Sequence, residues 1–151
     1  DENDVRAMGR TAAGVRGIKI KPGDEVISLI AVESDEGEIL FATANGFGKR
    51  TLVGDFSVQG RGGQGVISIK TSARNGRVVG AIKTNADEEI MLISNGGTLV
   101  RTPADDISVL GRNTQGVTLI RLGESEQLVQ IETVAAGEED VAQSDDGESD
   151  D

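Results

Sequence analysis

The sequence predicts an all-β protein built from repeated, propeller-like blades. Three segments, residues 9–15, 60–66 and 111–117, align at a constant offset of 51 residues, and each reads G-x-x-x-x-G-Val. Short runs rich in Val and Ile fill the units between these segments, and no useful run with helical periodicity occurs. Four short strands in about 51 residues match the size of a propeller blade.

The strands are predicted from apolar runs that Gly, Asn and Asp separate. The first full unit holds runs at 15–20, 25–32, 38–44 and 49–53, and the second at 66–70, 78–84, 89–94 and 99–102. A third unit begins with 117–122 and 128–134. The separators Asn45-Gly46, Asn75-Gly76 and Asn95-Gly96-Gly97 predict tight turns, because Asn and Gly accept positive φ at little cost.

The number of units predicts an open structure. A propeller closes with about four to eight blades, whereas this chain holds two full periods flanked by parts of two others. We therefore expect part of a larger disc, and the alternative is a short open array with an exposed edge.

The formal net charge of −11 belongs to the ends of the chain. Residues 1–4 carry three acids, residues 138–151 carry eight acids and no base, and the remaining 15 acids balance all 15 bases. We expect an acidic N-terminal stub at 1–4, a body of blades at 5–134 and a disordered acidic tail at 135–151.

Composition excludes most kinds of catalysis. The chain has no His, Cys, Trp or Tyr, so it lacks an imidazole base, a thiolate nucleophile and an ordinary zinc site. A carboxylate hydrolase is the enzyme alternative, although its candidates lie in turn-like sequence where solvated carboxylates are the default: Asp24, Glu25, Glu33, Asp35, Glu36 and Glu38. No apolar stretch suits a membrane span, and without Cys nothing indicates export, so we expect a cytoplasmic protein.

The repeated glycines invite a phosphate-loop interpretation, which their context argues against. A Walker loop needs Lys and then Ser or Thr after its second glycine, where the three copies have Val15, Val66 and Val117. The G-x-G-x-x-G pattern of residues 60–65 precedes a predicted strand, whereas a dinucleotide site must open a helix. We expect these glycines to form tight turns.

Basic residues recur with the repeat and predict contacts to a phosphate backbone. Arginine is the second residue of each loop and is flanked by small residues, so its guanidinium should project from the turn toward solvent. Three such turns would lie along one rim. Further bases follow the loops or lie in other strands, which gives the predicted DNA-binding set Arg10, Arg16, Lys19, Lys49, Arg50, Arg61, Lys70, Arg101, Arg112 and Arg121. With only three Phe for base stacking, duplex DNA is the favoured target. The alternative is a solvated surface with ion pairs.

Several strings resemble one family, the carboxyl-terminal domains of the DNA gyrase A protein, and more loosely those of topoisomerase IV. They are Met8-Gly9-Arg10-Thr11-Ala12-Ala13-Gly14-Val15-Arg16-Gly17-Ile18, Asn45-Gly46-Phe47-Gly48-Lys49-Arg50-Thr51, Gly65-Val66-Ile67-Ser68-Ile69-Lys70, Gly97-Thr98-Leu99-Val100-Arg101-Thr102 and Gly111-Arg112-Asn113-Thr114-Gln115-Gly116-Val117. The resemblance covers residues 5 to about 134. It implies a β-pinwheel, a six-bladed disc whose blades exchange a strand, of which this chain would hold the last two.

The resemblance also implies a function. The basic perimeter of such a disc bends and wraps duplex DNA and supports ATP-dependent negative supercoiling by the whole enzyme. The family's signature box, Gln-Arg-Arg-Gly-Gly-Lys-Gly, has a degenerate counterpart at residues 59–65, in which Gly60 and Gln64 replace two bases. Its role in starting the wrap is therefore in doubt.

The implied partners lie outside the chain. Type II topoisomerases cut DNA with a tyrosine, and this chain has none, so we expect no catalysis from it alone. We expect no cofactor or metal here, with ATP and Mg bound elsewhere. The implied partners are duplex DNA, the rest of the gyrase A protein and the gyrase B protein, in a heterotetramer on the chromosome. A protein-binding propeller fragment is the rival interpretation. The tail either competes with DNA for the basic rim or only aids solubility.

Overall fold

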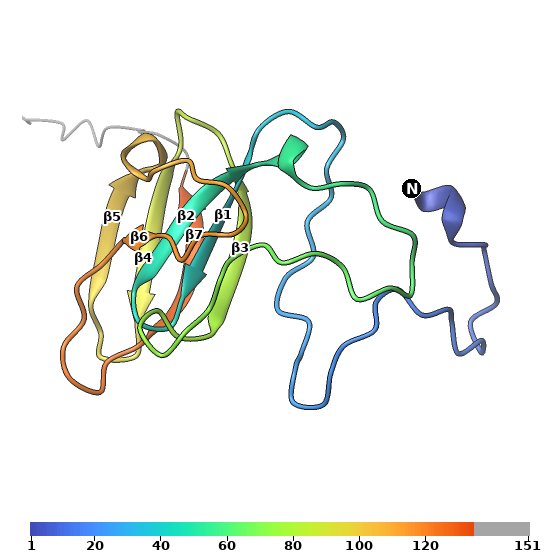
Figure 1. Ribbon diagram of the computed structural model, residues 1–151, viewed down its shortest axis with the longest axis horizontal. Helices are drawn as coiled ribbons and strands as arrows, with labels where there is room; N and C mark the ends of the chain where they lie inside the picture. Colours follow the sequence, from blue (N-terminus) through green and yellow to red (C-terminus); the bar gives the residue numbers. More distant parts are fainter. Residues whose placement is uncertain (135–151) are drawn as a thin grey trace, which may run out of the picture.

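The computed structural model describes residues 1–134, and the predicted acidic tail lies outside the described residues. These residues form two antiparallel β-sheets on one side, while extended segments before β1 and between β2 and β3 lie on the other (Figure 1). Their only helical elements are three 3-10 turns at Glu2–Asp4, Val53–Asp55 and Ala104–Asp106. The predicted all-β class is confirmed. Within residues 1–134, no helix has the length and apolar character needed to cross a membrane.

The first sheet combines strands from three successive units. It contains β1 (Glu38–Thr43), β2 (Phe47–Leu52), β3 (Val78–Thr84) and β6 (Val117–Thr118), in the order β3-β1-β2-β6. The hairpin β1–β2 turns through Asn45-Gly46, as predicted, with Gly46 at a φ of 84°. Because β3 and β6 come from later units, no unit completes this sheet by itself.

The second sheet repeats the first. It contains β4 (Glu89–Ser94), β5 (Leu99–Pro103) and β7 (Leu128–Val134), in the order β5-β4-β7. The register of β1 with β3 shifts between Ala42 and Thr43, and the register of β4 with β7 shifts 51 residues later, between Ile93 and Ser94. The repeat in the sequence is therefore also a repeat in backbone geometry.

The core lies between the two sheets, where β3 contacts β7. Leu40 and Ala42 of the first sheet pack with Ile90 and Leu92 of the second, and all four are fully buried. The cluster is completed by Ala104, Ile107, Ile120, Leu128 and Ile131. Leu40 and Ala42 occupy alternate positions of β1, and Ile90 and Leu92 occupy alternate positions of β4, as expected for sheets with one buried face.

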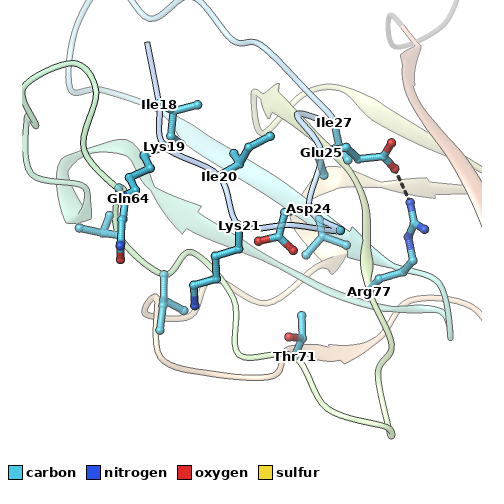
Figure 2. A pocket seen from close by; sticks show the side chains of 15 residues that line it. Ile18, Lys19, Ile20, Lys21, Asp24, Glu25, Ile27, Gln64, Thr71 and Arg77 are labelled. Atoms are coloured by element: carbon cyan, nitrogen blue, oxygen red, sulfur yellow. Dashed lines mark hydrogen bonds and ion pairs between the residues drawn. The ribbon is translucent and has the colours of Figure 1, made fainter. Parts of the chain in front are cut away.

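Three predicted strands do not form. Residues 15–20, 25–32 and 66–70 are irregular, and the predicted strand at 117–122 is reduced to two residues. In the first sheet the hairpin β1–β2 lies between β3 and β6, whereas the described residues contain no hairpin that pairs with 25–32 and 66–70. A strand needs such a partner for its backbone groups. Consequently Leu29 is 96% exposed, and residues from the segments 18–27 and 64–71 line a cavity of about 660 Å³ (Figure 2).

The second glycine of each repeated loop forms the turn that the sequence predicts. Gly14, Gly65 and Gly116 have φ values of 84°, 72° and 81°, a region that L-residues with a side chain rarely adopt. At Gly116 a Cβ would also overlap the carbonyl oxygen of Gly48, at the end of the short β2–β6 pairing. This glycine is therefore required both by its backbone conformation and by space.

Substituting Gly116 tests this close approach. Gly116→Ala should lower the free energy of unfolding in urea by about 2–4 kcal/mol, because backbone strain and overpacking add. Gly14→Ala is the control, since Gly14 has the same φ sign and no atom within 4 Å of an added Cβ. It should cost about 1–2 kcal/mol, which is the backbone strain alone. Equal losses for the two variants would contradict the packing argument.

Candidate nucleic-acid interface

The repeated loops lie in a row that backbone hydrogen bonds hold together. The amide of Lys19 donates to the carbonyl of Gly63 at 2.8 Å, and the amide of Lys70 donates to the carbonyl of Thr114 at 2.9 Å. These are the same bond, repeated after 51 residues. Each loop thus rests on the segment that follows the preceding loop, so the loops at 9–15, 60–66 and 111–117 follow one another along one edge.

The three loop arginines differ in the hydrogen bonds that their side chains make. The side chain of Arg10 is exposed and makes no hydrogen bond or ion pair within residues 1–134, as predicted for a group that projects to solvent. Arg61 donates from Nε to the carbonyl of Asp4 at 3.2 Å, and Arg112, which is half-buried, donates from Nη1 to the carbonyl of Ile67 at 3.0 Å. Arg61 and Arg112 therefore also tie loops to preceding segments, while their other guanidinium nitrogens remain available.

The bases that follow the loops are exposed. No salt bridge within the described residues engages Lys19, Lys70 or Arg121, which occupy equivalent places in the repeat. Arg16, directly after the first loop, is exposed as well. We call the following set the basic row: Arg10, Arg16, Lys19, Arg61, Lys70, Arg112 and Arg121.

Lys49 does not belong to the basic row. Its side chain is fully buried, and its ammonium donates to the carbonyls of Gly111 and Arg112, at 2.6 and 2.8 Å, and to the hydroxyl of Thr114 at 3.1 Å. Burial lowers the pKa of Lys49, and the nearby charge of Arg112 lowers it further. The prediction that Lys49 contacts DNA is therefore wrong. This lysine instead holds the third loop from beneath.

Arg50 also has a structural role, and Arg101 forms the equivalent ion pair one repeat later. The Arg50 side chain is buried, pairs with Glu38 at 2.5 Å and donates from Nε to the carbonyl of Ile107 at 2.8 Å. Arg101 pairs with Glu89, so the same pair recurs after 51 residues. The expected DNA contact is wrong for Arg50, and for Arg101 the half-exposed guanidinium is already neutralised. The glutamates that recur with these arginines were the signal of this pairing.

The six candidate carboxylates lie at exposed or half-buried positions, and two of them are ion-paired. Glu25 pairs with Arg77 at 2.6 Å, as Figure 2 shows, and Glu38 pairs with Arg50. None of the six candidate acids is buried, so none lies in the apolar, desolvated surroundings that a carboxyl general acid needs. Within the described residues no three His, Cys, Asp or Glu side chains form a group that could hold a metal ion.

Replacing Lys49 tests its role beneath the third loop. Lys49→Met keeps the length of the side chain but leaves the carbonyls of Gly111 and Arg112 without their donor. The free energy of unfolding in urea should therefore be about 2–3 kcal/mol lower than that of the wild type. Lys70→Met, at an exposed position of the basic row, should change stability by no more than about 0.5 kcal/mol. A Lys49→Met protein as stable as the wild type would contradict the anchoring role.

The chain is similar to parts of two type II topoisomerases, DNA gyrase and topoisomerase IV. The chain is 54% identical to the DNA gyrase A protein of Klebsiella oxytoca over 89% of its length, and 51% identical to that of Escherichia coli strain K12 over 93%. It spans only about 15% of these relatives. A solved DNA gyrase A C-terminal domain aligns with a TM-score of 0.77 at 33% identity, covering 86% of this chain and 44% of that one. A solved topoisomerase IV C-terminal domain aligns with a TM-score of 0.81 at 26% identity, covering 90% of this chain and 42% of that one.

A family model reproduces the repeat seen in the structure. The model, described as DNA gyrase C-terminal domain, beta-propeller, matches residues 1–33, 37–85 and 88–135. These matches follow the 51-residue period and together span most of the chain. Each match contains one of the three repeated loops, so the family's unit is the unit found here. The chain therefore belongs to the DNA gyrase C-terminal domain, beta-propeller family.

Proposed function

We propose that this chain binds duplex DNA through its phosphate backbone and bends it along the basic row, as the DNA-wrapping part of a DNA gyrase A protein. The observation that carries the proposal is the repetition of exposed, unneutralised bases at a fixed interval along one edge. Each phosphate that such a base neutralises releases counterions. Those contacts offset the cost of bending, which is about 1–6 kcal/mol for a smooth bend over 20–30 base pairs.

The side chains of the row favour backbone contacts over base recognition. Exposed guanidinium and ammonium groups can reach phosphate oxygens without entering a groove. The three aromatic rings do not form a stacking platform for single strands. Phe41 is buried and packs with Phe56 at a centroid distance of 6.0 Å, and the guanidinium of Arg74 lies over the ring of Phe47. These observations support a duplex target and binding that is independent of sequence.

The proposal divides labour between this chain and its partners. With no tyrosine in its 151 residues, the chain has no nucleophile of the kind that type II topoisomerases use for cutting. In our proposal it presents bent DNA, while the rest of the gyrase A protein cuts and the gyrase B protein hydrolyses ATP with Mg. The chain itself then needs no cofactor, and it acts in the cytoplasm on the chromosome as part of a supercoiling enzyme.

A salt titration of duplex binding tests the proposal. The affinity of the wild-type chain should fall steeply between about 50 and 200 mM salt. A triple variant, Arg10→Gln, Lys19→Gln and Lys70→Gln, should reduce the slope of log affinity against log salt by about 0.9 for each lost contact. These side chains carry no salt bridge within residues 1–134, so the variant should melt like the wild type.

The control removes as much charge away from the row. Arg77→Gln, Lys83→Gln and Arg101→Gln together should leave the slope close to that of the wild type. Wild-type affinity that is undetectable, or independent of salt, would overturn the DNA proposal and favour a protein-binding role. If the slope of log affinity against log salt falls by the same amount in both triple variants, the basic row is not the binding surface.

A further inference from the structure

A surface cleft of about 650 Å³ lies where the first sheet meets the segment that leads into the second. Phe47 and Thr118, paired neighbours on β2 and β6, line one part, and the turn at residues 121–127 lines another. Two arginines, Arg74 and Arg121, line the same cleft. Arg121 belongs to the basic row, whereas Arg74 has no counterpart in the other units, which have Gly23 and Ser125 at the equivalent positions.

Arg74 is positioned both through its backbone and through its side chain. Its turn is held by the side-chain amide of Asn45, which donates to the carbonyls of Ala73 and Arg74 at 3.2 and 3.1 Å. The guanidinium lies over the ring of Phe47, with its central carbon 4.7 Å from the ring centroid. Stacking of this kind uses the face of the guanidinium and leaves its N–H groups at the edge available to an anion.

The segment that carries Arg121 is equally well fixed. The amides of Leu119 and Ile120 both donate to the carbonyl of Gly46, at 2.8 and 3.2 Å, and the Ile120 side chain is buried. Next to it in the chain, the Arg121 side chain is exposed. The two arginines thus stand on separate segments that both bond to the β1–β2 turn, so their spacing is set by the fold.

One carboxylate lines the cleft, and its oxygens are already occupied. Glu126 accepts hydrogen bonds from the hydroxyls of Ser94 and Thr98 and, at 2.9 Å, from the amide of Gly123. These bonds lower the pKa of Glu126 to about 2, so it stays ionised while holding the 123–126 turn to the β4–β5 hairpin. It pairs with neither arginine in the described residues. Two positive charges against one negative leave the cleft with a net positive charge.

The cleft also continues the basic row between two of its members. Asn75, next to Arg74, is fully buried and donates to the carbonyls of Lys70 and Gln115, at 2.9 and 3.2 Å. This residue joins the segment of Lys70 to the third loop. Arg74 therefore lies on the connection between the Lys70 segment and the third unit, which carries Arg121, and it adds a base where the repeat itself provides none.

We propose that this cleft is a seat for one phosphodiester group of duplex DNA, which Arg74 and Arg121 contact from two sides. The inference rests on the proposed function and deepens it, because it assigns a specific anion site within the wrap. Planar guanidinium groups bond phosphate oxygens in a bidentate manner. Arg74, whose guanidinium is held over Phe47, and Arg121, whose backbone segment bonds to Gly46, present two such groups to one cleft.

Substitutions in the 151-residue chain test the seat with a duplex DNA of fixed length. Arg74→Gln and Arg121→Gln should each weaken binding by roughly threefold to tenfold and lower the salt slope by about 0.9. Arg74→Lys should keep the slope but lose affinity, because it retains the charge without the planar fork. Arg77→Gln is the control, since it removes an exposed arginine three residues away that is paired with Glu25. It should leave affinity and slope unchanged.

The outcomes separate the seat from the broader function. Steep salt dependence in the wild type, together with Arg74→Gln and Arg121→Gln variants that behave like Arg77→Gln, would overturn the seat and leave the DNA proposal standing. Loss of salt dependence in the wild type would overturn both. Thermal melts show whether Arg74→Gln also loses stability. If it does, Arg121→Gln and Arg74→Lys, which keep the turn at 73–76 intact, decide the question by the same slopes.

Discussion

The structure depends on the exchange of strands and backbone hydrogen bonds between successive units. Each hairpin needs an edge partner for its backbone groups, and that partner comes from the next unit, as β3 does for β1 and β7 does for β4. The bond from Lys19 to Gly63 and its copy from Lys70 to Thr114 add the loops to the same scheme. Because neighbours complete one another, the spacing of loops along the edge is fixed by the repeat.

The sequence predicted what depends on local pattern. The 51-residue period, the hairpins at 38–52 and 89–103 and the glycine turns follow from alternation and from residues that accept positive φ, and all are found. The strands at 25–32 and 66–70 were predicted from composition alone. They do not form because a strand also needs a neighbour, which the described residues do not contain.

For the basic residues, too, the predictions failed where contacts between distant parts of the chain decide the outcome. Lys49 and Arg50 looked like exposed charges because their acceptors, Gly111 and Ile107, lie about sixty residues away in the chain. No local pattern reveals such contacts. The repeated pairs Arg50–Glu38 and Arg101–Glu89 show that copied units copy structural charges too, which was the alternative kept open for these residues. Arg74 was missed for the opposite reason, since it does not recur.

What distinguishes the proposed interface is therefore the environment of each base. Buried bases such as Lys49 support the loops, and paired bases such as Arg101 stabilise hairpins. The exposed bases of the row, together with Arg74, are the ones we propose neutralise phosphates. Counterion release by several such contacts is enough to offset a moderate bend in the duplex.

Lysine acetylation in the presence and absence of duplex DNA, followed residue by residue by mass spectrometry, tests this central claim most directly. Lys19 and Lys70 should react freely in the unbound chain and become protected when DNA is added, while Lys83 on β3 keeps its reactivity and buried Lys49 stays unreactive throughout. Protection of Lys83 with Lys19 and Lys70 left reactive would contradict the account.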